Sequence, residues 1–225
     1  MAGAEFDYEQ ARYNMVEQQI RTWEVLDQDV LDLLFTVRRE EYVPPQYRTL
    51  AFVDFEIPLP GEGTARPRMW TPKMEARVLQ ELRVSRADRV LEIGTGSGYL
   101  TALLASSAAE VLSVEIDPAL AESARRKLAQ HGFGNVRVEC GDGARGYGED
   151  AYDVIVLTGS TPILPDRFMQ QLRPGGRLFA VVGEAPVMKA RLIRFTAPHA
   201  RVSTDLFETV IQPLQNALVP ERFVF

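Results

Sequence analysis

Residues 89–99 read Arg-Val-Leu-Glu-Ile-Gly-Thr-Gly-Ser-Gly-Tyr, and this stretch decides the fold. Its first half is a short apolar run, which is typical of a buried strand. The glycines at 94, 96 and 98 allow a tight turn in which the backbone comes within contact distance of a ligand. An apolar helix starting near Leu100 follows, and the first N–H groups of such a helix favour an anion. The stretch therefore predicts a strand, a ligand-binding glycine turn and a helix.

The chain on either side of this unit alternates between strand and helix patterns. Further strands are predicted at residues 111–117, 136–140, 152–158 and 176–182, the last entered through an Arg-Pro-Gly-Gly turn at 173–176. Helices are predicted at residues 74–82 and 118–130, and the second begins with proline, which suits a first helical turn. Repeated strand–helix–strand units imply an α/β fold with a doubly wound, mostly parallel sheet and right-handed crossovers.

The two ends of the chain follow other patterns. Beyond Pro186, strands at 191–195 and 204–211 are separated only by the link 196–203, which predicts an antiparallel hairpin at the edge of the sheet. Near the N-terminus, helices are predicted at 8–22 and 27–37, and prolines recur through residues 44–72, which forbids long regular elements there. We expect residues 1–72 to pack as an N-terminal helical extension on a core of residues 73–225, within a single domain.

Composition excludes several classes of function. The 225 residues contain 25 Lys and Arg against 31 Asp and Glu, a net charge of −6, so nothing electrostatic favours nucleic acid or anionic lipid as a partner. No apolar run approaches the roughly 18–20 residues of a membrane helix, and the N-terminus has no apolar signal segment. One cysteine, Cys140, precludes an internal disulfide, and two histidines are too few to suggest a structural metal. We expect a soluble, cytoplasmic protein.

Two acids are placed to extend the ligand site. Glu115 ends the second strand of the core, and Asp142 follows the third strand between two glycines. Because the carboxyl ends of parallel strands share one edge, both acids should lie in the crevice with the glycine turn. A carboxylate at Glu115 can accept from ribose hydroxyls, and one at Asp142 from an adenine amino group. These groups predict a nucleoside cofactor, and Tyr99 stands where the NAD fingerprint requires glycine.

A family resemblance covers nearly the whole chain. Residues 38–44 (Arg-Arg-Glu-Glu-Tyr-Val-Pro), 51–54 (Ala-Phe-Val-Asp), 90–99, 141–143 (Gly-Asp-Gly) and 212–214 (Gln-Pro-Leu) resemble the protein-L-isoaspartate O-methyltransferase family. The resemblance implies a seven-stranded, Rossmann-like methyltransferase sheet and the cofactor S-adenosyl-L-methionine, with S-adenosyl-L-homocysteine as product. It also implies methyl transfer to an isoaspartyl carboxylate of a damaged protein or peptide. The cofactor-binding residues expected on these grounds are Glu92, Gly94, Thr95, Gly96, Ser97, Gly98, Glu115, Ile116, Asp142, Gly143 and Thr158.

The chain departs from the family pattern at one position. The family carries Ser-x-Pro-x-Met before the first core strand, and its serine is assigned to the active site; here the segment reads Trp70-Thr71-Pro-Lys-Met. We therefore take Trp70 and Thr71 as the candidate catalytic positions. An indole can close the pocket to a peptide, or it can form a wall for another acceptor. The alternatives are a methyltransferase for a different small molecule and a non-catalytic relative that binds S-adenosylmethionine. The oligomeric state, monomer or dimer, stays open.

The chemistry of a carboxylate acceptor makes few demands on the protein. With a pKa near 4 such an acceptor is already ionised at neutral pH, so no general base is needed. Neutral donors for it are expected from the loop after the fourth core strand, at Thr158, Ser160 and Thr161. Arg66 and Arg68, in the proline-rich segment, are candidate cations for an acidic acceptor.

Overall fold

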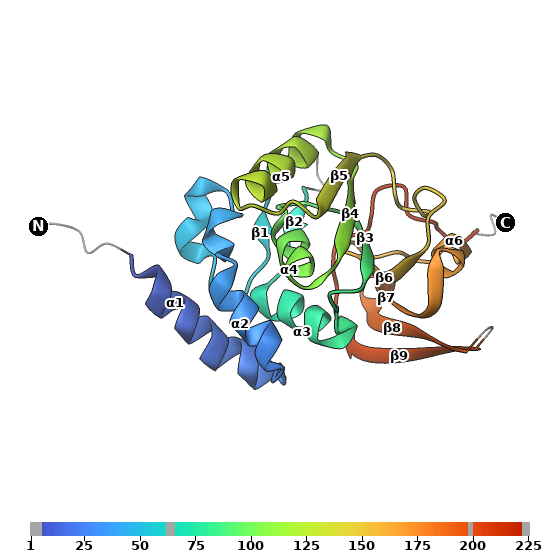
Figure 1. Cartoon of the computed structure of the whole chain (residues 1–225), viewed down its shortest axis with the longest axis horizontal. Coiled ribbons are helices and arrows are strands. Elements are labelled where there is room, and N and C mark those ends of the chain that lie inside the picture. The colour runs from blue at the N-terminus through green and yellow to red at the C-terminus, as the bar shows by residue number, and fades with distance from the viewer. Residues whose placement is uncertain (1–5, 62–65, 198–199, 222–225) are drawn as a thin grey trace, which may run out of the picture.

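The computed structural model describes residues 6–61, 66–197 and 200–221, and it is built around one twisted sheet (Figure 1). Five strands run parallel in the order β5-β4-β3-β6-β7, and the antiparallel strands β8 and β9 extend the β7 side. The strands are β3 (Arg89–Ile93), β4 (Glu110–Glu115), β5 (Val136–Cys140), β6 (Tyr152–Leu157), β7 (Leu172–Glu184), β8 (Val187–Ala197) and β9 (Ala200–Glu208). The predicted doubly wound α/β sheet with an antiparallel edge hairpin is confirmed.

Helices flank this sheet, and capping side chains explain where several of them begin. The α-helices are α1 (Tyr8–Met15), α2 (Gln28–Thr36), α3 (Pro72–Leu82), α4 (Tyr99–Ser107), α5 (Pro118–Gln130) and α6 (Asp166–Gln170). The Asp27 side chain accepts from two backbone N–H groups at the start of α2, and Asp117 does the same for α5. In α5 the proline occupies the first turn, where its missing N–H costs nothing.

The N-terminal segment contains only short elements after α2. A 3-10 turn spans Arg39–Glu41, another spans Pro45–Leu50, and the two-residue strands β1 (Ile57–Pro58) and β2 (Arg68–Met69) pair as an antiparallel ribbon. This matches the irregular segment expected from its prolines. The predicted helix over 8–22 is continuous, but it passes from α1 into a π turn at Val16–Ile20 and a 3-10 turn at Arg21–Trp23.

Three details differ from the sequence-based expectation. The Arg-Pro-Gly-Gly segment is a bulge within β7, because Tyr152 pairs with Leu172 and Val154 already pairs with Arg177. The hairpin strands are longer than predicted and leave only residues 198–199 between them. These two residues, one of which is His199, lie outside the described residues. Helix α6 was not predicted, since five residues are too few to show a helical period.

The core forms two layers, one on each face of the sheet. Along β6, Val154 and Val156 face the layer that contains the first five α-helices, while Ile155 and Leu157 face the layer covered by α6 (Figure 1). Buried residues of the N-terminal segment, such as Leu31, belong to the first layer. The division of the chain near residue 72 into an N-terminal extension and a core therefore stays a prediction. Within the described residues, no helix is long and apolar enough to cross a membrane.

The order of the strands creates the crevice. The chain builds β4 and β5 on one side of β3 and then returns to place β6 and β7 on the other side. At such a switch point the helices leave β3 and β6 in opposite directions, and ligands bind beyond the carboxyl ends of these strands. The glycine turn after β3 stands at this point.

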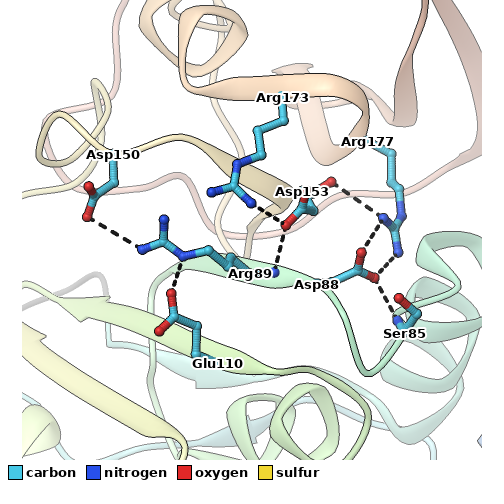
Figure 2. Close-up of polar contacts among 8 residues, drawn as sticks. All are labelled: Ser85, Asp88, Arg89, Glu110, Asp150, Asp153, Arg173 and Arg177. Atoms are coloured by element: carbon cyan, nitrogen blue, oxygen red, sulfur yellow. Dashed lines mark hydrogen bonds and ion pairs between the residues drawn. The ribbon is translucent and has the colours of Figure 1, made fainter.

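The opposite, amino-terminal edge of the sheet is held by a charged network (Figure 2). Arg177 of β7 donates from Nη2 to Asp88 Oδ2 at 2.6 Å, and the same oxygen accepts from the Ser85 backbone N–H at 2.6 Å. Arg177 also donates from Nε to the carbonyl of Leu82 at 2.5 Å. Burial opposes the charge of Asp88, but the bonds from Arg177 and Ser85 outweigh it and hold the pKa of this carboxyl below its usual value.

We predict that Asp88→Asn destabilises the protein by about 1–3 kcal/mol at neutral pH, because charge-assisted hydrogen bonds are lost. The depressed pKa means that this stabilisation is present above the unfolded pKa of about 3.9 and is lost as the pH falls below it. Urea unfolding of both proteins at neutral and acidic pH measures the difference. Glu122→Gln is the matched control, since its carboxylate is 59% exposed and pairs only with Arg125 on the surface of α5. Equal stability of wild type and Asp88→Asn at pH 7 would contradict the assignment.

Candidate functional site

A cleft opens at the carboxyl ends of β3, β4 and β6. Its floor is the glycine turn, and its walls come from the β1–β2 ribbon and from a C-terminal segment. Of the residues predicted to bind a cofactor, those that line it are Gly94, Thr95, Gly96, Ser97, Glu115, Ile116 and Thr158. The residues of three strands that are far apart in the sequence are thus brought together at one edge.

The glycine turn requires glycine for geometric reasons. Gly94 has φ +97° and Gly98 has φ +84°, which are left-handed values that other residues rarely adopt. A Cβ on Gly94 would also collide with the Thr158 hydroxyl. That hydroxyl donates to the carbonyls of Ile93, at 2.9 Å, and Gly94, at 2.7 Å. The turn is therefore fastened to the end of β6.

Glu115 fastens the same turn from the side of β4. Its Oε2 accepts from the Gly96 N–H at 2.7 Å, and its Oε1 accepts from the Asp117 N–H at 3.0 Å. Burial raises the pKa of Glu115, and the bonds from these two N–H groups oppose the rise. The carboxylate is fixed at the cleft wall, where a ligand hydroxyl can reach it.

Glu92 lies beneath the cleft rather than in its lining. Its Oε2 accepts from the hydroxyls of Thr101, at 2.5 Å, and Ser113, at 2.6 Å. Its Oε1 is buried and has no hydrogen-bond partner among the described residues. Burial raises the pKa of Glu92 to about 7, against the hydroxyl bonds that lower it, and the nearby charge of Glu115 adds to the rise. An orphaned acceptor of this kind is suited to a donor supplied by a ligand.

Asp142, Gly143 and Gly98 surround the cleft without lining it. Asp142 Oδ1 accepts from the Ala144 N–H at 3.0 Å, and its Oδ2 accepts from Asn216 Nδ2 at 2.8 Å. A Cβ on Gly143 would lie 2.7 Å from Cδ1 of Ile93, so close packing keeps this position small. Gly98 is the left-handed residue that begins α4. Asp142 therefore sits at the outer end of the site, next to the C-terminal segment.

The two candidate catalytic positions are placed differently. Trp70 lines the cleft and is only 6% exposed, with its ring edge-on to Phe179 at a centroid distance of 6.1 Å. Thr71 is the N-cap of α3, where its hydroxyl accepts from the Met74 N–H at 3.4 Å, and it does not line the cleft. Trp70 therefore borders the cleft, and Thr71 holds the backbone at the start of α3, directly after Trp70.

Sequence reasoning missed a buried ion pair behind Trp70. Arg39 is 1% exposed, donates from Nη2 to the Trp70 carbonyl at 2.6 Å, and pairs with the carboxylate of Glu75, which lines the cleft. Its Nε donates to the Ala51 carbonyl at 2.8 Å. Burial lowers the pKa of Arg39 to about 10, still well above neutral pH. The sequence signal that could have indicated this pair is Glu75, an acid on the apolar face of the predicted helix at 74–82.

The loop after β6 does not present its hydroxyls to the cleft. Ser160 and Thr161 are fully buried and donate to the carbonyls of Ile211, at 3.2 Å, and Ile163, at 2.5 Å. The backbone of Ser160 instead pairs with residues 212–214, whose side chains close one wall of the cleft. This C-terminal wall was indicated only through the Gln-Pro-Leu resemblance.

Comparison with known proteins gives consistent matches. The family model described as protein-L-isoaspartate(D-aspartate) O-methyltransferase matches residues 10–215. A protein-L-isoaspartate O-methyltransferase from Methanoculleus marisnigri is 41% identical over 194 residues, which cover 86% of each chain. One from Rhodopseudomonas palustris is 42% identical and covers 86% of this chain and 76% of its own.

Solved structures agree in fold. One described as a protein-L-isoaspartate O-methyltransferase superposes with a TM-score of 0.76 at 25% identity, covering 92% of this chain and 65% of its own. A Plasmodium falciparum structure described under the same activity, in complex with S-adenosyl-L-homocysteine, gives a TM-score of 0.74 at 18% identity and covers 93% and 99%. The second match supports the fold alone.

The raised pKa of Glu92 predicts a distinct pH dependence in the ligand-free protein. The folded state binds this proton more tightly than the unfolded chain, whose Glu pKa is about 4.3, so stability is lost as the pH rises from there to about 7. Between about pH 5 and about pH 8 we expect wild type to lose roughly 1–3 kcal/mol more unfolding free energy than Glu92→Gln. Denaturant titrations at both pH values measure this difference. Parallel pH profiles for the two proteins would show that Glu92 titrates normally.

Proposed function

The chain belongs to the protein-L-isoaspartate(D-aspartate) O-methyltransferase family, and from this premise we propose that it methylates the carboxylate of isoaspartyl residues in damaged proteins or peptides. The observation that carries the proposal is the cleft at the carboxyl ends of β3, β4 and β6, with a glycine turn as its floor and Trp70 in its wall. We place this activity in the cytoplasm, as a step of protein repair.

S-adenosyl-L-methionine is the cofactor, and the cleft has the features needed to hold it. The glycine turn leaves room for close backbone approach, Glu115 offers a fixed carboxylate to ribose hydroxyls, and Glu92 Oε1 is a buried acceptor that no described residue pairs with. Asp142, which does not line the cleft and accepts from Asn216, stays our candidate acceptor for an adenine amino group. When bound, the cofactor supplies a methyl group on a positively charged sulfur, which makes that methyl reactive toward a nucleophile.

The residues of the chain contribute alignment and exclusion of water rather than proton transfer. An isoaspartyl carboxylate is ionised at neutral pH and needs no base. Consistently, the described residues that line the cleft include no His, Cys or Lys. The barrier is then lowered mainly by holding the acceptor in line with the methyl group in a site closed to solvent.

Trp70 takes the place of the family's serine as part of the acceptor wall. Its ring is fixed by Phe179, and its backbone is fixed by Arg39, so the indole presents a rigid surface beside the methyl donor. Thr71 acts as a positioning residue, because the α3 cap that it forms holds the chain directly after Trp70. A rigid indole in the cleft wall favours an active enzyme with a reshaped pocket over a relative that has lost catalysis.

We predict that Glu115→Ala weakens binding of S-adenosyl-L-homocysteine by about 1–3 kcal/mol, because the ligand hydroxyls lose their acceptor. Isothermal titration calorimetry measures the affinity directly. Glu110→Gln is the matched control, since this acid lies at the other end of β4 and pairs with Arg89, away from the cleft. Unchanged affinity in Glu115→Ala would remove Glu115 from the cofactor site.

We predict base-labile incorporation of labelled methyl groups into a peptide that contains one isoaspartyl residue, and none into its aspartyl counterpart. Trp70→Phe should keep kcat/KM within about threefold, because the wall is retained, whereas Trp70→Ala should lower it about tenfold or more. The unfolding midpoint of each variant is recorded in parallel, since truncating a buried indole also costs about 3–5 kcal/mol of stability. Absence of turnover by a wild type that binds the cofactor product would contradict the proposed function.

A further inference from the structure

The charges that line the cleft are unevenly balanced. Two are acids: Glu75, which is neutralised by Arg39 behind it, and Glu115, which is held by backbone N–H groups and committed to the cofactor. Arg68 is the one cation among the described residues of the lining. A negatively charged acceptor that enters the cleft therefore meets Arg68 as the one cation among the described lining residues. Coulomb attraction favours the Arg68 end for its carboxylate.

The guanidinium of Arg68 makes one long ion pair with the described part of the chain. Its nearest charged partner is Glu56, and Arg68 Nε lies 4.0 Å from Glu56 Oε2, which is beyond hydrogen-bond distance. Among the described residues its side chain makes no hydrogen bond, and it is 49% exposed. The buried Arg39, in contrast, uses its donors on two carbonyls and a carboxylate. Arg68 thus has donors that no described residue takes, and a planar carboxylate can receive two parallel hydrogen bonds from a guanidinium.

The hydroxyls of the loop after β6 are already committed to the backbone. Those of Thr158, Ser160 and Thr161 donate to backbone carbonyls. These three hydroxyls therefore do not compete with Arg68 for the acceptor.

The backbone of Arg68 is held in register with the cleft. In the β1–β2 ribbon it pairs with Pro58, the Leu59 N–H donates to the Pro67 carbonyl at 2.8 Å, and Met69 is buried. Trp70 follows directly and is anchored by Arg39. A half-exposed guanidinium on a paired backbone can meet an incoming carboxylate without a rearrangement of the chain.

We propose that Arg68 binds the acceptor carboxylate and so determines the preference of this enzyme for an ionised acceptor. The inference rests on the proposed function, and it makes Arg68 a binding group rather than a driver of methyl transfer. Methylation changes the charge of the acceptor from −1 to zero, so the ester product loses the ion pair and is released more easily. Because Arg68 stabilises the ionised ground state at least as well as the transition state, its loss should raise KM and leave kcat nearly unchanged.

The test uses a peptide with one isoaspartyl residue, an acetylated N-terminus and an amidated C-terminus, so that a single carboxylate is present. In Arg68→Gln we expect KM for this peptide to rise about tenfold or more, the scale of a lost charge-assisted hydrogen bond, with kcat within about threefold of wild type. Arg68→Lys should restore part of the loss because it keeps the charge. Arg66→Gln is the matched control, since Arg66 is exposed and does not line the cleft.

A second measurement isolates the carboxylate. A peptide with isoasparagine in place of isoaspartate carries a neutral carboxamide, and its inhibition constant should be the same for wild type and Arg68→Gln. The affinity for S-adenosyl-L-homocysteine, from calorimetry, should also be unchanged.

Three results would overturn the proposal. An unchanged KM in Arg68→Gln would remove Arg68 alone from the acceptor site, while the proposed function stands. An equal rise in KM and in the inhibition constant of the carboxamide peptide would show that Arg68 acts through shape and not charge. Absence of methylation by a wild type that still binds S-adenosyl-L-homocysteine would overturn the proposed function, and the assignment of Arg68 would fall with it.

Discussion

The site depends on how the glycine turn after β3 is fastened. Thr158 holds it from β6, and Glu115 holds it from β4, so the two strands that flank β3 fix the position of one short loop. The turn adopts left-handed backbone angles that only glycine takes readily, and the two fastenings keep it in that form. A cofactor that lies on this loop meets groups placed before it arrives, which reduces the cost of ordering on binding.

A second constraint links the N-terminal segment to the same cleft. Arg39 is completely enclosed, and it joins the Ala51 carbonyl, the Trp70 carbonyl and the Glu75 carboxylate. A buried charge is tolerated only when it is paired and hydrogen-bonded, so these three segments must assemble together. The backbone of the wall that carries Trp70 and Arg68 is therefore positioned by the N-terminal segment and by α3, while Phe179 of β7 contacts the Trp70 ring.

The elements with strong periodicity could be predicted from the sequence, and the departures have physical causes. The bounds predicted for α5 and β5 agree with the structure, because proline and the flanking glycines mark their ends. Helix α6 escaped prediction because five residues are too few to show a helical period, and the bulge in β7 escaped it because pairing with β6 sets it. In the site, the seven lining residues from the glycine turn, β4 and β6 were among those expected from the glycine motif, the rule for parallel strands and the family resemblance, whereas Asp142, expected by the same rule, does not line the cleft. The Arg39–Glu75 pair was not foreseen, because no local sequence pattern brings two residues so distant in sequence together. The hydroxyls of Ser160 and Thr161 point inward because they donate to backbone carbonyls, which only the folded structure places near them.

We infer as the central point that one cleft brings an adenosine-bearing methyl donor and an ionised acceptor together, with the glycine turn as its floor and with Glu115, Trp70 and Arg68 in its lining. A crystal structure with S-adenosyl-L-homocysteine tests it most directly. We predict the ribose hydroxyls at the Glu115 carboxylate and the sulfur atom directed toward Trp70 and Arg68. A nucleoside bound elsewhere, or in this cleft with its sulfur directed away from those two residues, would contradict the account.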